Sequence, residues 1–235
     1  MKVIILAGGR GLRLKGDIDI PKPMLELSNG KFLLEHQVGW LLSHNIKSSD
    51  ILISISREVS DILDSIYTDE FKSIFRLAEF IEDKHLGTGG AIKNIMSRVK
   101  DNVYYIMNVD DLIFSDTYAP IRDLLEIPRY YMANILMGYG RFPYGVVYTK
   151  YGWNGRVELF EQKPLITDKP IYIGHMSVTK DIEHMLPDVG DFEAKTLPYL
   201  VEKKLLYATG LKGQWMTINT IKDLNEVNSY LKPLR

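Results

Sequence analysis

The sequence of 235 residues contains no cysteine, and its charges nearly cancel. The absence of cysteine excludes disulfide bonds, thiolate metal sites and cysteine nucleophiles, and it fits a cytoplasmic protein. Because 29 basic residues stand against 30 acidic ones, we expect neither a nucleic-acid-binding surface nor an electrostatic membrane anchor. The composition therefore gives no sign of a nucleic-acid or membrane partner.

Long apolar runs are also missing. The run at residues 3–7 is too short for the apolar region of a signal peptide, and glycines follow it at once. No stretch approaches the roughly 20 apolar residues that span a bilayer. We therefore expect a soluble cytoplasmic protein.

Histidines are few, and none of them forms a pair with metal-ligand spacing or a visible Ser-His-Asp arrangement. The five are His36, His44, His85, His175 and His184. We expect each to be a core or surface residue, with His175 the one most worth testing. A phosphate group that attacks a triphosphate is already an anion, so such a reaction needs positioning and charge neutralisation rather than a general base.

Strand and helix patterns alternate up to residue 125, which predicts a Rossmann-like α/β fold with a mixed, mostly parallel sheet flanked by helices. From residue 126 onward, aromatic and β-branched segments are separated by glycine, proline and asparagine, and a hairpin turn is predicted at residues 151–155. We expect one domain, residues 1–235, with halves 1–125 and 126–235. The expected strands are residues 3–7, 51–55, 75–81, 103–107, 131–137, 144–149, 156–160 and 171–178. The expected helices are residues 31–42, 59–66, 87–99, 117–125, 179–185, 192–203 and 221–231.

The most informative motif is Val-Ile-Ile-Leu-Ala-Gly-Gly-Arg-Gly-Leu-Arg-Leu at residues 3–14, followed by Pro-Lys-Pro-Met at residues 21–24. An apolar strand ends in a glycine-rich loop, whose backbone N–H groups can approach phosphate oxygens. Arg10, Arg13 and Lys22 could neutralise a triphosphate, and flanking prolines restrict the backbone around Lys22. The alternative is a tight strand–helix turn with solvated charges. The loop matches neither a Walker A motif nor a dinucleotide fingerprint.

Two further motifs lie at ends of expected elements. Asp110 and Asp111 follow the strand at residues 103–107, and a carboxylate at a strand end is a natural Mg²⁺ ligand, or else a turn or helix-capping residue. Residues 87–90 (Gly-Thr-Gly-Gly) precede a helix. They suit either contact with a base or phosphate, or close packing, and the spacing does not separate the two.

Taken in order, these motifs resemble those of the sugar-1-phosphate nucleotidyltransferase family, which includes thymidylyltransferases and guanylyltransferases. The resemblance runs from residue 3 to about residue 231. Besides the opening motif, the matching segments are residues 86–92, 108–110, 144–147, 156–164, 191–193 and 213–220.

The resemblance implies the nucleotide-diphospho-sugar transferase fold and a reaction in which an NTP and a sugar 1-phosphate give an NDP-sugar and pyrophosphate with Mg²⁺. It implies a nucleotide-binding half (1–125) and a sugar-phosphate-binding half (126–235). By position, it assigns nucleotide binding to Leu6, Gly8, Gly9, Arg10, Gly11, Gly87 and Gly90. It assigns catalysis to Arg13, Lys22 and Asp110. It assigns the sugar phosphate to Gly145, Gln162, Lys163, Gly174 and Glu193.

The sequence departs from the family pattern at several positions. Leu12 replaces a threonine, Val109 a glycine and Gln162 a glutamate. The family's second metal-binding aspartate aligns with Thr217, so Asn219 and Asp111 are further candidates beside Asp110 for the metal. The sequence ends at Arg235, and we expect no β-helix tail.

Two alternatives to this enzyme stay open. A catalytically weak relative would bind a nucleotide or nucleotide-sugar as a sensor or subunit, and Thr217 motivates this hypothesis. A transferase acting on a non-sugar phosphate is disfavoured by the segment at residues 156–164. The base, the sugar and the oligomeric state are not determined by the sequence, which is compatible with a homo-oligomer.

Overall fold

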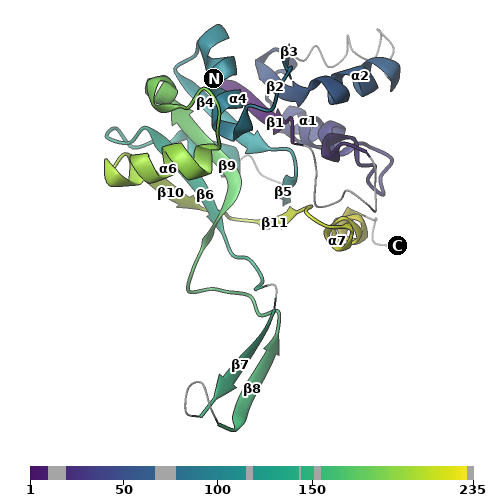
Figure 1. Cartoon of the computed structure of the whole chain (residues 1–235), viewed down its shortest axis with the longest axis vertical. Helices are drawn as coiled ribbons and strands as arrows, with labels where there is room; N and C mark the ends of the chain where they lie inside the picture. Colours follow the sequence, from purple (N-terminus) through teal and green to yellow (C-terminus); the bar gives the residue numbers. More distant parts are fainter. Residues whose placement is uncertain (10–19, 67–77, 115–118, 143, 151–154, 232–235) are drawn as a thin grey trace.

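Seven strands form one central sheet in the computed structural model, which describes residues 1–9, 20–66, 78–114, 119–142, 144–150 and 155–231 (Figure 1). From edge to edge the strands are β10 (Leu206–Gly210), β6 (Ala133–Gly138), β9 (Ile171–Thr179), β4 (Val103–Asn108), β1 (Lys2–Ala7), β2 (Ile51–Ser56) and β3 (Ala78–Glu82). Only β9 runs antiparallel to its neighbours, β4 and β6. The remaining pairs are parallel, which confirms the predicted mixed, mostly parallel sheet.

Strand β1 shows how the sequence produces this interior. Successive residues of a strand face opposite sides of the sheet. Val3 and Ile5 accordingly lie in the core on one face, and Ile4 lies in the core on the other. All three side chains are fully buried. The unbroken apolar run is therefore the mark of a strand covered on both sides.

Helices cover both faces of the sheet (Figure 1). One face packs against α1 (Leu33–Ser43), α2 (Arg57–Ile66), α5 (Ala119–Leu125) and α7 (Ile221–Leu231). The other packs against α4 (Gly87–Arg98), the 3-10 helix η3 (Lys180–Met185) and α6 (Phe192–Glu202). A 3-10 turn, η2 (Ser48–Asp50), precedes β2. Within the described ranges, no helix has both the length and the apolar character that crossing a membrane requires.

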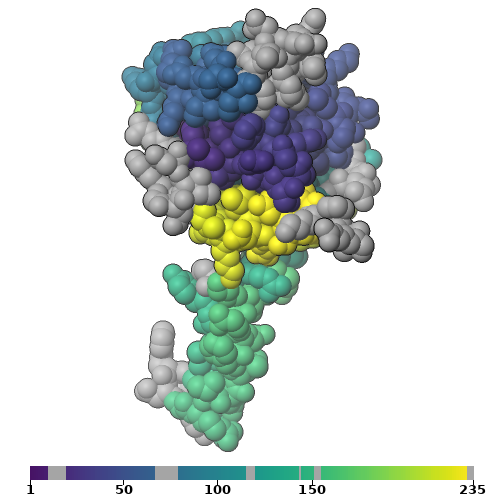
Figure 2. All heavy atoms as spheres, turned by 90° about the vertical axis from the view of Figure 1, so that its right-hand side faces the viewer, coloured from purple at the N-terminus to yellow at the C-terminus, as the bar shows by residue number. Residues whose placement is uncertain are grey.

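Two small antiparallel ribbons stand outside the central sheet. Strand β5 (Asp111–Phe114) pairs with β11 (Gln214–Thr217) beside the carboxyl end of β4. Strands β7 (Gly145–Thr149) and β8 (Val157–Gln162) pair with each other and extend away from the body as an arm (Figures 1 and 2). The expected turn falls between them, although residues 151–154 lie outside the described part.

The structure differs from the expectations in a few elements. The strands β5, β10 and β11 were not predicted, because these short segments mix polar and apolar residues without a clear period. The segment before Pro187 forms a 3-10 helix instead of an α-helix. The expected strand at 75–81 corresponds to β3, Ala78–Glu82, and residues 75–77 lie outside the described part.

Candidate active site

The glycine loop and the aspartate pair meet because β1 and β4 are parallel neighbours. Leu6 and Asn108 are register partners at the carboxyl ends of these strands. The backbone N–H of Val109 also donates a hydrogen bond to the carbonyl of Leu6, 3.1 Å away. The segments that follow the two strands, at residues 8–9 and 110–111, therefore begin side by side. Ligands of open α/β sheets bind at this edge.

A hollow of about 230 Å³ lies at this edge. Its lining includes five of the predicted residues, namely Leu6, Gly8, Gly9, Gly87 and Asp110. Glu82, Asn108 and Asp191 line it as well. Residues from the ends of β1, β3 and β4 and from the start of α4 thus share one site.

Lys22 projects its ammonium into the centre of this edge. Pro21 and Pro23 flank it, and it opens the 3-10 helix η1 (Lys22–Met24). Its Nζ donates to Asp110 Oδ2 at 2.7 Å and to Asn219 Oδ1 at 3.4 Å. Both side chains of the Lys22–Asp110 pair are mostly buried. Lys22, predicted to bind phosphate, and Asp110, predicted to bind the metal, are therefore direct neighbours. Asn219, from the second half of the chain, also contacts the Lys22 ammonium.

Asn219 is oriented by a short chain of hydrogen bonds. Its amide Nδ2 donates to Thr217 Oγ1 at 3.1 Å, which leaves Oδ1 facing Lys22. Thr217 in turn bonds the carboxylate of Asp111, its register partner across the β5–β11 ribbon. The position where the family has an aspartate is thus occupied by a residue that links Asn219 to Asp111.

Asp111 is buried and is not among the residues that line the hollow. Its carboxylate accepts hydrogen bonds from Asn108 Nδ2 at 3.0 Å and Trp215 Nε1 at 3.1 Å, as well as from Thr217. Burial and the nearby charge of Asp110 raise the pKa of Asp111 to about 7, although the three donors act against this rise. Asp111 therefore ties β4 to β11 instead of facing the hollow.

Gly174 lies against this carboxylate. Its φ of +74° belongs to the left-handed region, and a Cβ there would collide with Asp111 Oδ2 and Asn108 Nδ2. The glycine assigned to the sugar phosphate is thus required for the packing of Asp111. Sequence reasoning had no means of finding this contact, which joins strands β9 and β5.

The backbone of the aspartate pair is held by buried polar side chains. The carbonyl of Asp111 accepts from His175 Nε2 at 2.8 Å and Gln37 Nε2 at 2.9 Å, and Gln37 also donates to the carbonyl of Val109 at 2.9 Å. Because a carbonyl only accepts, His175 carries its proton on Nε2 and accepts at Nδ1 from Tyr105 Oη, 2.6 Å away. Burial lowers the pKa of His175 to about 4. The histidine is a neutral core residue, as predicted, and holds the strand end that carries Asp110.

The glycines in the first turn of α4 have different surroundings. Gly87, at φ +74°, lines the hollow. Gly90 instead packs against the loop before α6, where a Cβ would lie 2.6 Å from the carbonyl oxygen of Asp188. The structure thus places Gly90 in close packing, and it is not among the residues that line the hollow.

Glu193 lies at the junction of α4 and α6. Its Oε2 accepts from Thr88 Oγ1 at 2.7 Å, and Thr88 Oγ1 accepts from the N–H of Phe192 at 2.8 Å. Burial, together with the charges of Glu193 and Asp111, raises the pKa of Tyr172 well above its usual value. The structure therefore links Glu193 to Thr88, which lines the hollow.

Glu82 is a site residue that sequence reasoning missed. It is buried, and its Oε1 accepts from Ser54 Oγ at 2.6 Å while Oε2 accepts from the N–H of Leu86 at 3.2 Å. A Cβ on Gly8 would lie 2.9 Å from Glu82 Oε1. Glu82 is the last residue of β3. A carboxylate at the carboxyl end of a strand is the signal that could have identified it, because ligands of such sheets bind at these ends.

The remaining sugar-phosphate residues lie on the arm. Gly145 and Gln162 are cross-strand partners at its root. Lys163 follows with φ +51°, and its carbonyl accepts from Arg141 Nη1 at 3.3 Å. The arm extends away from the sheet edge (Figure 1), so these residues do not join Lys22 and Asp110. A hollow of about 810 Å³ between the two regions is lined by Arg141, Trp215 and Thr217 among others.

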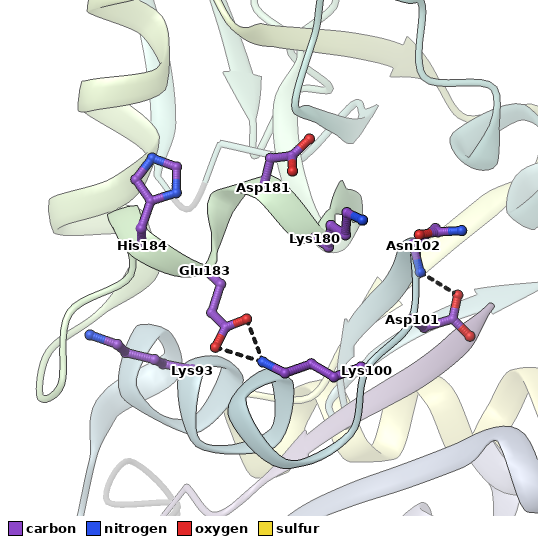
Figure 3. A pocket seen from close by; sticks show the side chains of 8 residues that line it. All are labelled: Lys93, Lys100, Asp101, Asn102, Lys180, Asp181, Glu183 and His184. Atoms are coloured by element: carbon purple, nitrogen blue, oxygen red, sulfur yellow. Dashed lines mark hydrogen bonds and ion pairs between the residues drawn. The ribbon is translucent and has the colours of Figure 1, made fainter.

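A third hollow, of about 760 Å³, lies among α4, the segment before β4 and η3 (Figure 3). It is lined by residues before β4 and on η3, so it opens at the amino end of β4, away from Asp110. Its charged side chains include one ion pair within the lining, between Lys100 Nζ and Glu183 Oε2 at 2.8 Å. It shares no residue with the site at the carboxyl ends.

A family model described as Nucleotidyl transferase matches residues 2–232. The chain belongs to the nucleotidyl transferase family. The mannose-1-phosphate guanyltransferase of Pichia angusta is 30% identical over 247 residues, covering 100% of this chain and 65% of that protein. Mannose-1-phosphate guanylyltransferase 1 of Arabidopsis thaliana is 28% identical and covers 100% and 66%. The chain therefore spans less than two thirds of the length of these relatives.

Solved structures of the family agree with the fold. HddC from Yersinia pseudotuberculosis, complexed with GMP-PN, superposes with a TM-score of 0.73 at 28% identity, covering 98% of this chain and 99% of that one. UDP-glucose pyrophosphorylase complexed with UDP-glucose gives 0.67 at 18% identity and 97% coverage of both chains, which supports the fold alone. Of the residues that the family resemblance assigns, Arg10, Gly11 and Arg13 lie outside the described residues, as does Leu12.

Proposed function

We propose that this member of the nucleotidyl transferase family transfers a nucleotidyl group from an NTP to a sugar 1-phosphate, giving an NDP-sugar and pyrophosphate. The observation that carries the proposal is the Lys22–Asp110 pair, 2.7 Å long, beside the glycine-lined hollow. The sugar-phosphate oxygen forms a bond to the α-phosphorus while the bond from the α-phosphorus to the bridging oxygen breaks, and pyrophosphate leaves with that electron pair.

The residues around the hollow suit this chemistry without a general base. The attacking phosphate is an anion, so the site has to position it and to neutralise charge. The Lys22 ammonium is proposed to stabilise the charge at the reacting phosphate, and Arg13 to hold the departing pyrophosphate. His175, the buried histidine near the centre, is neutral and fully engaged, which agrees with a reaction that moves no proton through it.

The proposed cofactor is Mg²⁺, and the residues present fit it. Asp110 Oδ2 and Asn219 Oδ1 both face the same cation, the Lys22 ammonium. Mg²⁺ binds oxygen ligands and usually takes one or two from protein while phosphates and waters supply the others. When bound, the ion would neutralise the triphosphate.

The proposed base is guanine. The relatives from Pichia angusta and Arabidopsis thaliana are guanylyltransferases by name, and HddC was solved with GMP-PN. Guanine presents adjacent N–H donors at N1 and N2, which a carboxylate can accept. Glu82 offers such a carboxylate at the hollow, and its two recorded hydrogen bonds leave lone pairs available on both oxygens.

We propose that residues 1–125 bind the nucleotide and residues 126–235 the sugar phosphate, as two halves of one domain. Lys22 and Asp110 come from the first half, whereas Asn219 comes from the second. Gln162 and Lys163 would bind the sugar phosphate from the arm. The proposed reaction centre therefore lies at the seam between the halves.

Pyrophosphate release with a panel of NTPs and sugar 1-phosphates, with Mg²⁺ present, tests this function. We expect turnover with GTP and a sugar of the mannose 1-phosphate type, well above that with the other nucleotides. Tight binding of an NTP without turnover across the panel would favour the nucleotide-binding sensor instead. Turnover only with a non-sugar phosphate would assign a different acceptor.

A further inference from the structure

A hydroxyl group interrupts the buried apolar side chains of β2. Ser54 lies in the sequence Ile-Leu-Ile-Ser-Ile-Ser and is fully buried. Its register partners are Leu6 on β1 and Phe80 on β3, and residues at the same level of parallel strands share a face. Leu6 and Phe80 both pack in the core that includes α4. A hydroxyl buried among apolar side chains costs free energy unless it has a hydrogen-bond partner.

The partner of Ser54 is the carboxylate of Glu82. Glu82 lies two residues beyond Phe80 on β3, so its side chain emerges on the same face of the sheet as that of Ser54. Ser54 Oγ donates to Glu82 Oε1 at 2.6 Å. Glu82 lines the hollow at the carboxyl ends of the strands, whereas Ser54 is not among the residues that line it. The hydroxyl therefore supports the carboxylate from the interior of the protein.

Two further contacts restrict the same carboxylate. Its Oε2 accepts from the N–H of Leu86, 3.2 Å away, in the segment before α4. The glycine loop passes close to Oε1, because a Cβ on Gly8 would lie only 2.9 Å from this oxygen. Both recorded donors are neutral, and each carboxylate oxygen has lone pairs for more than one hydrogen bond. The carboxylate is thus fixed in orientation and is still able to accept donors from a ligand.

We propose that Ser54 is a positioning residue for recognition of the base. Its hydroxyl fixes the side chain of Glu82 so that the carboxylate faces the adjacent N–H donors of guanine, at N1 and at the 2-amino group. The inference rests on the proposed function, in which Glu82 accepts from the base. A glutamate side chain has several rotatable bonds, and ordering them before the ligand arrives lowers the cost of binding. Ser54 thereby contributes to the preference for guanine without touching the nucleotide.

The ratio of the dissociation constants for ATP and GTP measures this role. Adenine has an acceptor at N1 and no amino group at C2, so it offers the carboxylate no donor at this edge. Equilibrium titrations with Mg²⁺ and without a sugar phosphate give both constants. We expect the wild type to bind GTP at least about a hundredfold more tightly than ATP, because two hydrogen bonds to a charged acceptor are absent with adenine.

Ser54→Ala should lower this ratio at least about fivefold. The ordering cost of Glu82 then falls on GTP, whereas with ATP the released carboxylate can turn away from the adenine N1 lone pair. A role in stability alone would weaken the binding of both nucleotides together. Denaturant unfolding and far-UV circular dichroism check that the variant is folded under the conditions of the titration.

Two comparisons separate positioning from a general effect on the core. Ser177→Ala removes another fully buried serine hydroxyl, one on β9 that donates to the carbonyl of Leu124, and should leave the ratio unchanged. In a Glu82→Ala background, Ser54→Ala should not change the ratio further, because the effects of residues that act through one another are not additive. A ratio that stays at the wild-type value in Ser54→Ala, or that falls again in the Glu82→Ala background, would overturn the proposal.

The wild type distinguishes failure of this proposal from failure of the proposed function. If the wild type prefers GTP and Ser54→Ala keeps the full preference, Ser54 has no positioning role and the assignment of guanine stands. If the wild type binds GTP and ATP equally well, the positioning role and the assignment of guanine are both wrong.

Discussion

At the scale of single residues, two oxygens from distant parts of the chain converge on the Lys22 ammonium. Asp110 lies on the turn after β4, and Asn219 lies between β11 and α7. Thr217 fixes the amide of Asn219, so the residue that departs from the family pattern still has a defined role at the site. We interpret the loss of the family's aspartate as a transfer of the ligand role to Asn219.

Replacing Asp110 tests the first of these oxygens. Asp110→Ala removes the carboxylate proposed to hold Mg²⁺, and it leaves the Lys22 ammonium without its ion-pair partner. We expect Mg²⁺-dependent turnover to fall by at least about a thousandfold, which corresponds to about 4 kcal/mol, while circular dichroism stays unchanged. The matched control is Asp181→Ala, an exposed aspartate on η3 at the opposite edge. Unchanged activity of the Asp110 variant would refute the metal assignment.

Asn219 makes a weaker contribution, because an amide oxygen is neutral. For Asn219→Ala we expect the Mg²⁺ concentration for half-maximal activity to rise several-fold, with a smaller loss of activity at saturating Mg²⁺. An Mg²⁺ titration of initial rates measures this shift. Asn225→Ala, at an exposed position on α7, is the control. A titration curve that does not move would exclude Asn219 as a ligand.

Gly174 tests the packing around Asp111. Gly174→Ala must place a side chain at φ +74° and push against the Asp111 carboxylate. We expect a loss of unfolding free energy of at least about 2 kcal/mol, measured by denaturant titration. The control, Gly210→Ala, adds a Cβ that meets nothing within 4 Å. Equal stability of the two variants would show that the left-handed turn and its contact are unimportant.

At the scale of elements, the carboxyl ends of β1, β3 and β4 build the site, and β5, β9 and α1 support it. The long apolar strands were predictable, because three to five buried residues in a row, most of them apolar, produce a clear pattern. The ribbon of β5 and β11 could not be predicted from the sequence. It forms only when two short segments about a hundred residues apart pair, and it brings Thr217 to Asp111. Local patterns contain no information about such a meeting.

His175 makes the junction of β9 and β5 sensitive to pH. Its folded-state pKa, about 4, lies below the usual 6.5, so the unfolded chain binds the proton more readily as pH falls below 6.5. Stability from the neutral histidine is therefore present above pH 6.5 and is lost toward pH 4. Between pH 7.5 and 5, we expect the stability of the wild type to fall by about 2 kcal/mol relative to His175→Asn.

Asp111 affects the same pH range in the opposite direction. Its raised pKa, about 7, lets the folded state keep a proton that the unfolded chain releases, so this group favours folding as pH falls below 7. The wild type and His175→Asn both contain Asp111, so its contribution cancels in the difference between their unfolding free energies. Denaturant unfolding of the two proteins across this range is the measurement. A difference that stays constant with pH would contradict the assignment of a neutral, buried His175.

The root of the arm provides the prediction for the acceptor half. Lys163 has φ +51°, a conformation that asparagine tolerates, so Lys163→Asn removes the charge with little strain. We expect KM for the sugar phosphate to rise at least tenfold, while KM for the NTP changes little. Lys204→Asn is the control, since Lys204 has φ +59° and is exposed near α6. An effect confined to the NTP would show that Lys163 serves the nucleotide.

At the scale of the whole molecule, the chain combines a sheet covered on both faces (Figure 1) with an arm that protrudes from the body (Figure 2). The sequence predicted a mixed, mostly parallel sheet. It also predicted that the carboxyl ends of β1 and β4 meet near Lys22. The extension of the arm away from Lys22 and Asp110 was not predicted, because alternating apolar residues are also expected of a hairpin folded onto the body. The role of the arm in binding the acceptor therefore remains a proposal for Gly145, Gln162 and Lys163. The structure places Gly174 against Asp111, and Glu193 against Thr88 of the hollow.

The central claim is the joining of two phosphate substrates at the seam between the halves. The most direct test is ³¹P NMR of the products formed from GTP, mannose 1-phosphate and Mg²⁺. We predict that GDP-sugar and pyrophosphate appear in equal amounts, only when both substrates are present, and not with Asp110→Ala. Pyrophosphate released from GTP without the sugar phosphate, or no GDP-sugar with any sugar 1-phosphate and NTP, would contradict the proposed function.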